Sequence, residues 1–140
     1  MSITPFTQAQ KEQVIEKFRR DRYAAHSGIE IVDLYPGYAK VKMEIQDYHL
    51  NSVDIVHGGA IFTLGDYACA LAGNCEESSS VAIEANVSYL KPASSGTLFA
   101  EAKAISQSKS LISFDVTITD EKGGSIARYY GRSFIRRNRD

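Results

Sequence analysis

Several residue types are scarce in this chain, and each scarcity removes a class of protein. The 140 residues include two cysteines, three prolines and no tryptophan. Cys69 and Cys75 are too few for the disulfide framework of a small secreted protein and match no metal-ligand spacing, so we expect two reduced thiols and no metal. Neither sign of charge dominates, with 16 basic and 17 acidic residues. This balance disfavours nucleic acid as the main partner.

Long apolar runs are also lacking. The best candidate for a membrane span is interrupted by Asp66, so we expect no membrane partner. The first residues show no basic segment followed by an apolar one, which predicts a cytoplasmic protein without a secretory signal. With 44% apolar residues and no linker-like shift in composition, the sequence predicts a single domain over residues 1–140.

The hydrophobic period changes along the chain. Val14, Ile15 and Phe18 recur at helical spacing behind a capping Thr7, which predicts a helix over about residues 7–23. From residue 29 the period is two, which predicts a hairpin at 29–45 and four further strands after residue 80. Short hairpins between these strands imply an antiparallel sheet.

A second helical segment, about residues 58–73, separates the two groups of strands and has almost no polar face. A helix of this kind must be buried on most sides. The sequence therefore predicts an α+β fold in which a curved antiparallel sheet wraps around a central apolar helix. The small side chains of Ala100, Ala102 and Ala104 are expected where the helix comes close to the sheet.

The start of this central helix carries the main functional signal. His57 precedes the pair Gly58 and Gly59, and Asp66 is the only charged residue between His57 and Glu76. A carboxylate in an apolar helix is costly to bury, so its presence calls for a chemical reason. Backbone N–H groups at a helix start favour anionic oxygen. An anion site and a buried carboxylate together suit acyl transfer.

The element order and the run from Asn51 to Asp66 resemble the hotdog-fold acyl-CoA thioesterases, in particular the phenylacetate-pathway (PaaI-like) type. The resembling pattern places Asn51 seven residues before Gly58 and Asp66 eight residues after it. Supporting stretches are residues 89–92, 96–98 and 131–133, and the likeness covers roughly residues 25–135. Ala70 departs from relatives that place a serine or threonine one turn after the acidic residue.

The resemblance implies a role for each matching residue. Asp66 is the general base or nucleophile, and the Gly58 N–H is the oxyanion donor. Asn51 positions the substrate or the attacking water, and His57 supports the same loop. Gly59 is counted among the substrate-binding residues.

Spacing along the helix has a consequence for assembly. Eight residues of α-helix rise about 12 Å, so one helix can hardly bring Gly58 and Asp66 to the same carbonyl group. Two antiparallel copies of the helix can do so. We therefore expect a homodimer or a dimer of dimers, which the resemblance also implies.

Basic residues of the later strands are candidates for the nucleotide end of coenzyme A. Arg128 and Arg132 share parity on the last strand, and arginine binds phosphate with two parallel hydrogen bonds. Lys91 and Lys109, at strand ends, are expected to join them. The alternative is a solvated outer face of the sheet.

The sequence predicts an acyl-CoA thioester hydrolase that needs no bound cofactor, because coenzyme A is part of the substrate. Aromatic, phenylacetyl-like acyl groups are expected first, with Phe62, Tyr67 and Tyr89 near the site, and medium-chain acyl groups remain open. Two other functions also remain open: an acyl-CoA hydratase or dehydratase on the same fold, and an acyl-CoA binding or sensing domain without catalysis.

Overall fold

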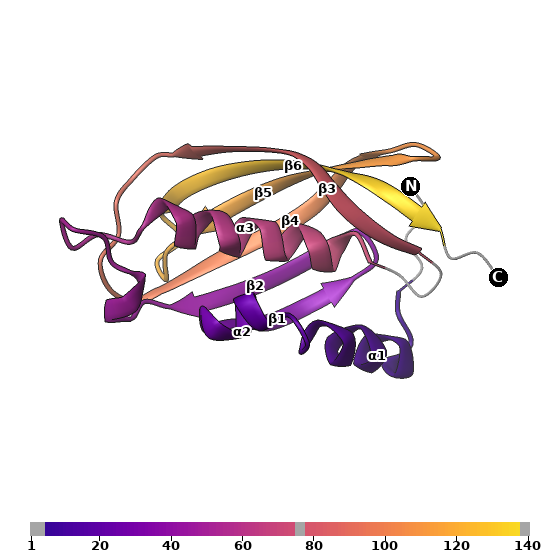
Figure 1. Ribbon diagram of the computed structural model, residues 1–140, viewed down its shortest axis with the longest axis horizontal. Coiled ribbons are helices and arrows are strands. Elements are labelled where there is room, and N and C mark those ends of the chain that lie inside the picture. The colour runs from indigo at the N-terminus through magenta and orange to yellow at the C-terminus, as the bar shows by residue number, and fades with distance from the viewer. Residues whose placement is uncertain (1–4, 75–77, 138–140) are drawn as a thin grey trace.

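A single antiparallel sheet dominates the computed structural model of the chain, which describes residues 5–74 and 78–137 (Figure 1). Its six strands lie side by side in the order β1-β2-β4-β5-β6-β3. Their bounds are β1 Ile29–Tyr35, β2 Tyr38–Glu44, β3 Ser78–Tyr89, β4 Thr97–Gln107, β5 Leu111–Thr119 and β6 Ser125–Arg137. The short 3-10 turn η1, Asp47–His49, lies in the segment between β2 and the central helix.

The central helix α3, Gly58–Ala72, runs along the concave side of the sheet (Figure 1). Its inner face is buried and consists mainly of Ile61, Leu64, Ala68 and Leu71. The alternating residues of β2 and β4 that face it have no solvent exposure: Ala39, Val41, Met43, Leu98, Ala100 and Ala102. Small side chains on β4 let the helix approach the sheet, as expected. The predicted hotdog architecture is confirmed.

The edge strand β3 departs from the expected pattern. Its sequence alternates from Val81 to Tyr89, which predicts one continuous apolar face. The register with β6 shifts between Ala82 and Glu84, so Val81 and Ala85 lie on opposite faces of the sheet. This β-bulge moves the later apolar residues toward α3 and leaves Val81 48% exposed.

The expected N-terminal helix over residues 7–23 is two helices, α1 Gln8–Phe18 and α2 Arg22–His26. The predicted cap is present, because the Thr7 hydroxyl accepts a hydrogen bond from the Gln10 N–H. The break is caused by Asp21, whose carboxylate accepts the Ala24 N–H and so caps a new helix.

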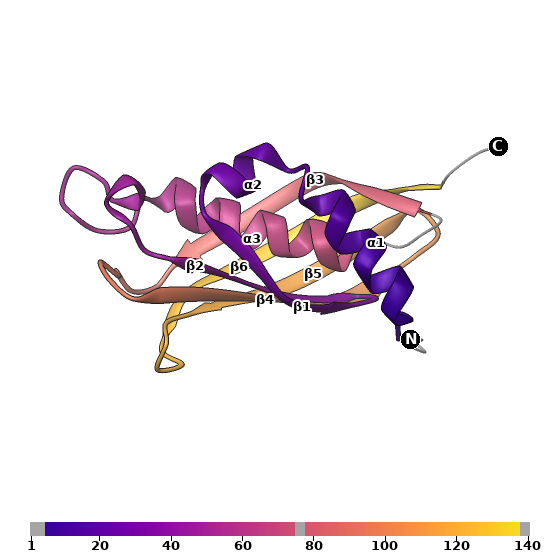
Figure 2. The same ribbon diagram turned by 90° about the horizontal axis from the view of Figure 1, so that it is seen from below.

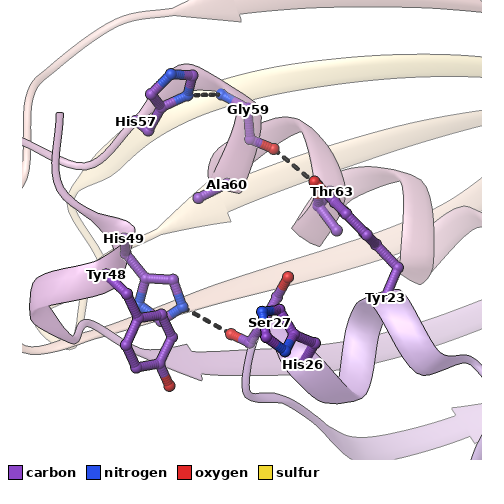
Figure 3. A pocket seen from close by; sticks show the side chains of 9 residues that line it. All are labelled: Tyr23, His26, Ser27, Tyr48, His49, His57, Gly59, Ala60 and Thr63. Carbon is purple, nitrogen blue, oxygen red and sulfur yellow. Dashed lines mark hydrogen bonds between the residues drawn. The ribbon is translucent and has the colours of Figure 1, made fainter.

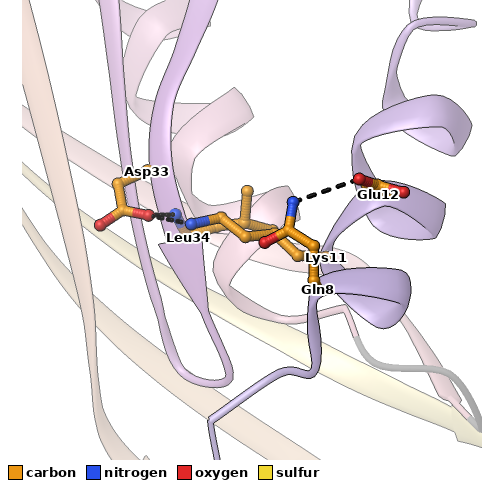
Figure 4. A network of polar contacts seen from close by, with 5 residues as sticks. All are labelled: Gln8, Lys11, Glu12, Asp33 and Leu34. Carbon is orange, nitrogen blue, oxygen red and sulfur yellow. Dashed lines mark hydrogen bonds and ion pairs between the residues drawn. The ribbon is translucent and has the colours of Figure 1, made fainter.

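Both helices lie at the β1 edge of the sheet, on the side that carries α3 (Figure 2). An ion pair between Lys11 and Asp33, 2.6 Å long, ties α1 to β1 (Figure 4). The Lys11 ammonium and the Leu34 N–H both bind the Asp33 carboxylate and lower its pKa, with Lys11 the main cause. Among the described residues, no helix is long and apolar enough to cross a bilayer.

Candidate active site

The start of α3 presents one free backbone donor. The Nδ1 atom of His57 accepts the Gly59 N–H at 2.8 Å and caps the helix (Figure 3). The N–H groups of Ala60 and Ile61 bind the His57 carbonyl. Within residues 5–74 and 78–137, the Gly58 N–H has no acceptor. Of the two glycines, Gly58 is therefore the one whose N–H is available to a ligand, while the Gly59 N–H is occupied by His57.

Tyr89, at the end of β3, fixes the other side of Gly58. Its hydroxyl donates to the Gly58 carbonyl at 2.9 Å. A Cβ atom at Gly58 would lie 3.0 Å from that hydroxyl, so a side chain there would have to displace Tyr89. Sequence reasoning treated Tyr89 as an apolar strand residue and an aromatic neighbour of the site, and did not predict that it anchors the helix start.

Asn51 organises the loop ahead of the helix. Its side-chain oxygen accepts the N–H groups of Val53 at 3.0 Å and Ile55 at 3.2 Å. This closes a tight turn in which Asp54 takes a positive φ of 60°. The oxygen of Asn51 is thus committed to the loop, and its amide NH₂ is the part left for a ligand.

Asp66 lies half-buried on the side of α3 that borders β6 and β3, with Phe62 and Ala70 one turn away on either side. Desolvation raises the pKa of its carboxyl group above the ordinary range, and Asp21 adds to this, while a hydrogen bond from the Tyr129 hydroxyl at 3.4 Å works against it. Sequence reasoning missed Tyr129, which is 1% exposed and lies on β6. Burial therefore favours proton uptake by this carboxylate at a higher pH than for an exposed aspartate.

Gly58 and Asp66 are far apart within one chain. They are eight residues apart on one continuous helix, which corresponds to about 12 Å of axial rise. A single carbonyl group needs its oxyanion donor and its base each about 3 Å away. Gly58 and Asp66 of one chain are therefore too far apart to act on the same carbonyl group.

A cavity of about 640 Å³ adjoins the helix start (Figure 3). Its walls come from α2, η1 and the first turns of α3: Tyr23, His26, Ser27, Tyr48, His49, His57, Gly59, Ala60 and Thr63. His49 is a satisfied loop residue, because Nδ1 accepts the Gln46 N–H and Nε2 lies 2.6 Å from the Ser27 carbonyl. That it lines this cavity together with His26 was not expected from the sequence.

A second cavity, of about 260 Å³, lies beside Asp66 toward β3. It is lined by Asp66, Cys69, Ala70, Ser80, Val81, Ala82 and Ser133. Burial raises the pKa of the Cys69 thiol, which makes it a packing residue rather than a nucleophile. Cys75 lies outside the described residues. The described part of the chain contains no cluster of three or more side chains that could hold a metal ion.

The four basic candidates are not gathered together. Arg128 forms an ion pair with Asp115 at 2.6 Å, and Arg132 contacts Glu84 at 3.7 Å, both at the outer side of the sheet. Lys91 follows the end of β3, near the start of β4, whereas Lys109 lies in the hairpin at the opposite end of β4. Within one chain they form no continuous stripe.

Tyr67 is removed from the expected aromatic surroundings of the site. It points toward α1, where its hydroxyl donates to the Phe18 carbonyl at 3.2 Å and its ring meets the Phe18 ring edge-on. Its position beside Asp66 in sequence places it on a different side of the helix.

Known proteins similar to this chain point to one family. The model of the Thioesterase superfamily matches residues 54–127. A protein of Archaeoglobus fulgidus, provisionally named an esterase, is 38% identical over 74% of this chain and 73% of its own. The acyl-coenzyme A thioesterase PaaI of Escherichia coli is 32% identical over 83% of this chain and 84% of its own. A solved structure of the E. coli PaaI protein superimposes with a TM-score of 0.83 at 27% identity, covering 93% of this chain and 96% of that one.

Proposed function

The chain belongs to the Thioesterase superfamily, and from that premise we propose that it hydrolyses acyl-coenzyme A thioesters to a free acid and coenzyme A. One observation carries the proposal. The same helix offers a free N–H at Gly58 and a half-buried carboxylate at Asp66, which are the oxyanion donor and the base that thioester hydrolysis needs. The name of the E. coli relative, an acyl-coenzyme A thioesterase, supports the substrate class.

Two routes use these groups. In the first, the Asp66 carboxylate removes a proton from a water molecule, whose oxygen attacks the thioester carbonyl carbon. In the second, the carboxylate itself attacks and forms a mixed anhydride, which water then hydrolyses. In both, the Gly58 N–H stabilises the oxyanion, the carbon–sulfur bond breaks, and the thiolate of coenzyme A leaves and takes up a proton.

The complete site requires a second copy of the chain. Among the described residues, no strand pairs with the outer edge of β3, and both faces of the strand are largely exposed, with Val81 at 48% and Ile83 at 57%. An exposed apolar edge of this length favours pairing with another strand. Antiparallel pairing of two β3 edges about a two-fold axis would bring two α3 helices together, so that Gly58 of one chain faces Asp66 of the other.

The acyl group is proposed to occupy the 640 Å³ cavity next to Gly58. Tyr23 and Tyr48 form aromatic walls at its rim, both more than two-thirds exposed. Aromatic side chains pack well on aromatic ligands, so phenylacetyl-like groups are proposed ahead of medium-chain acyl groups. For the nucleotide of coenzyme A, Lys91 is the candidate without an ion pair among the described residues, whereas Arg128 and Arg132 would have to exchange their carboxylate partners.

Thiol release from a panel of aromatic and straight-chain acyl-CoAs tests the activity, with Asp66→Asn as the matched variant. Hydrolysis of at least one class by the parent protein and loss in Asp66→Asn are expected. Hydration of an enoyl-CoA without thiol release would identify a hydratase instead. Binding of acyl-CoA with neither reaction would identify a binding domain.

Mixed dimers test the shared site. Gly58→Pro removes the donor and Asp66→Asn removes the base, so each homodimer should be inactive. Proline is tolerated in the first turn of a helix, although Tyr89 must move, and circular dichroism checks the fold. A dimer of the two variants should regain about half of the activity, because symmetry leaves one site intact. A dimer of the parent with a Gly58→Pro/Asp66→Asn chain should stay inactive. If instead the dimer of parent and double-variant chains were active and the dimer of the two single variants were inactive, both groups would belong to one chain.

A further inference from the structure

A buried tyrosine ring lies directly behind the proposed catalytic carboxylate. Tyr129, on β6, is 1% exposed, and its ring is held edge-on by Phe62 of α3 with the ring centres 5.3 Å apart. Its hydroxyl reaches Asp66 Oδ1 at 3.4 Å. Within the described residues, Tyr129 is the only hydrogen-bond partner of this carboxylate, so Oδ2 is left for water or substrate.

Two glycines make the space that this ring occupies. A Cβ atom at Gly65, in the middle of α3, would lie 2.8 Å from the Tyr129 Cγ and Cδ2 atoms. A Cβ atom at Gly131, two residues along β6, would lie 3.2 Å from its Cε1 atom. Neither glycine has a positive φ, so no turn requires them. Glycine weakens a helix interior relative to alanine, and the close approach of the ring is the structural reason for accepting that cost at Gly65.

In the described part of the chain, few charged or titratable groups surround Asp66. Tyr129 faces it from β6, the Cys69 thiol from its own helix, and Asp21 from the start of α2. The β3 residues in the adjoining cavity, Ser80, Val81 and Ala82, carry no charge. Burial, with the Asp66 charge as a further cause, raises the pKa of Tyr129, so the phenol stays protonated and remains a donor while the carboxylate titrates.

We propose that Tyr129 is a positioning residue for the reaction: its hydroxyl holds Asp66 Oδ1 and thereby presents Oδ2 to the attacking water or the thioester carbonyl. This inference rests on the proposed function. A hydrogen bond to the charged form also favours ionisation, which counteracts the desolvation of the carboxylate.

Tyr129→Phe tests the proposal, because it removes one hydroxyl and keeps the ring in its slot. The pH at which kcat/KM falls on the acid side should rise by about one unit, equivalent to about 1.4 kcal/mol. At the alkaline plateau kcat should fall about tenfold with KM unchanged, since a poorly oriented base acts only on the chemical step. Tyr67→Phe is the matched control: it removes a buried hydroxyl from the residue next to Asp66, and its profile should match the parent. Equal profiles for Tyr129→Phe and the parent would overturn the proposal.

A second readout is independent of hydrolysis. The ¹³C carboxyl resonance of Asp66, assigned by its loss in Asp66→Asn, should titrate at higher pH in Tyr129→Phe than in the parent. In the parent, the Tyr129 ¹³Cζ resonance should shift with the same apparent pKa as that carboxyl group. If these NMR results hold but no acyl-CoA is cleaved, the proposed function fails and the Tyr129–Asp66 coupling stands. If Asp66→Asn abolishes cleavage while neither resonance responds, only the role of Tyr129 fails.

Discussion

Replacing Gly65 by alanine adds one methyl group against the Tyr129 ring, and the structure sets the size of the effect. The new Cβ would lie 2.8 Å from two ring carbons, about 0.7 Å closer than ordinary carbon–carbon contact. Overpacking of this kind costs about 1–3 kcal/mol, and the better helix propensity of alanine returns about 1 kcal/mol. The net loss of stability should be about 0–2 kcal/mol.

For a chain of this size that loss corresponds to a melting temperature lower by up to about 6 °C. Calorimetry measures it directly. The ring can relieve the contact only by moving away from the helix, which also lengthens the 3.4 Å hydrogen bond to Asp66. Gly65→Ala should therefore reduce kcat and shift the acid side of the pH profile upward, in the same direction as Tyr129→Phe.

A double-mutant cycle isolates the contact. In a Tyr129→Leu background the smaller side chain leaves room for the methyl group, so Gly65→Ala should become neutral or stabilising there. The coupling between the two sites should be about 1–3 kcal/mol. A Gly65→Ala protein that is about 1 kcal/mol more stable than the parent, with an unchanged pH profile, would refute the idea that Gly65 exists to admit Tyr129.

Three further changes have defined outcomes. Asp66→Asn should raise the free energy of unfolding by about 1 kcal/mol or less at neutral pH, because burial raises the pKa of Asp66 and penalises its charge. Chemical denaturation should show that this gain vanishes at acid pH, where the parent carboxyl group is neutral. Ile83→Lys places a charge on the exposed β3 edge, so the variant should be inactive and light scattering should show a monomer. An active dimer would exclude this edge as the interface. In the same denaturation assay, Asp33→Asn should lower the free energy of unfolding by less than about 1 kcal/mol at neutral pH and leave it unchanged at acid pH. The reason is that Lys11 lowers the pKa of Asp33, and the stabilisation is lost as the carboxylate protonates. A loss of stability that does not depend on pH would contradict the ion pair as its source.

Local patterns in the sequence predict most of this fold. Alternation identifies the strands whose inner residues are fully buried, and the lack of a polar face identifies α3 as central. The bulge after Ala82 was not predicted, because the apolar alternation continues through it and no glycine marks it. The break at Asp21 was not predicted, because the helical spacing of the apolar residues gives no sign that this aspartate caps a second helix.

The same distinction between local patterns and long-range contacts applies to the candidate site. The cap formed by His57 on Gly59 involves neighbours in the chain, and such contacts follow from a short motif. Tyr129 lies 63 residues from Asp66 and Tyr89 lies 31 residues from Gly58, so only the folded chain brings them together. One signal was present: Gly65 stands inside a helix, where no turn requires a glycine.

The unpartnered edge of β3 also has a consequence for how this protein responds to dilution. If each chain holds only half of each site, activity depends on the fraction of chains that are paired. At low protein concentration, activity then rises more steeply than the protein concentration. Specific activity measured at nanomolar protein would then understate that at micromolar protein. A substrate that bridges both half-sites would hold the pair together, so the apparent KM should rise as the protein is diluted.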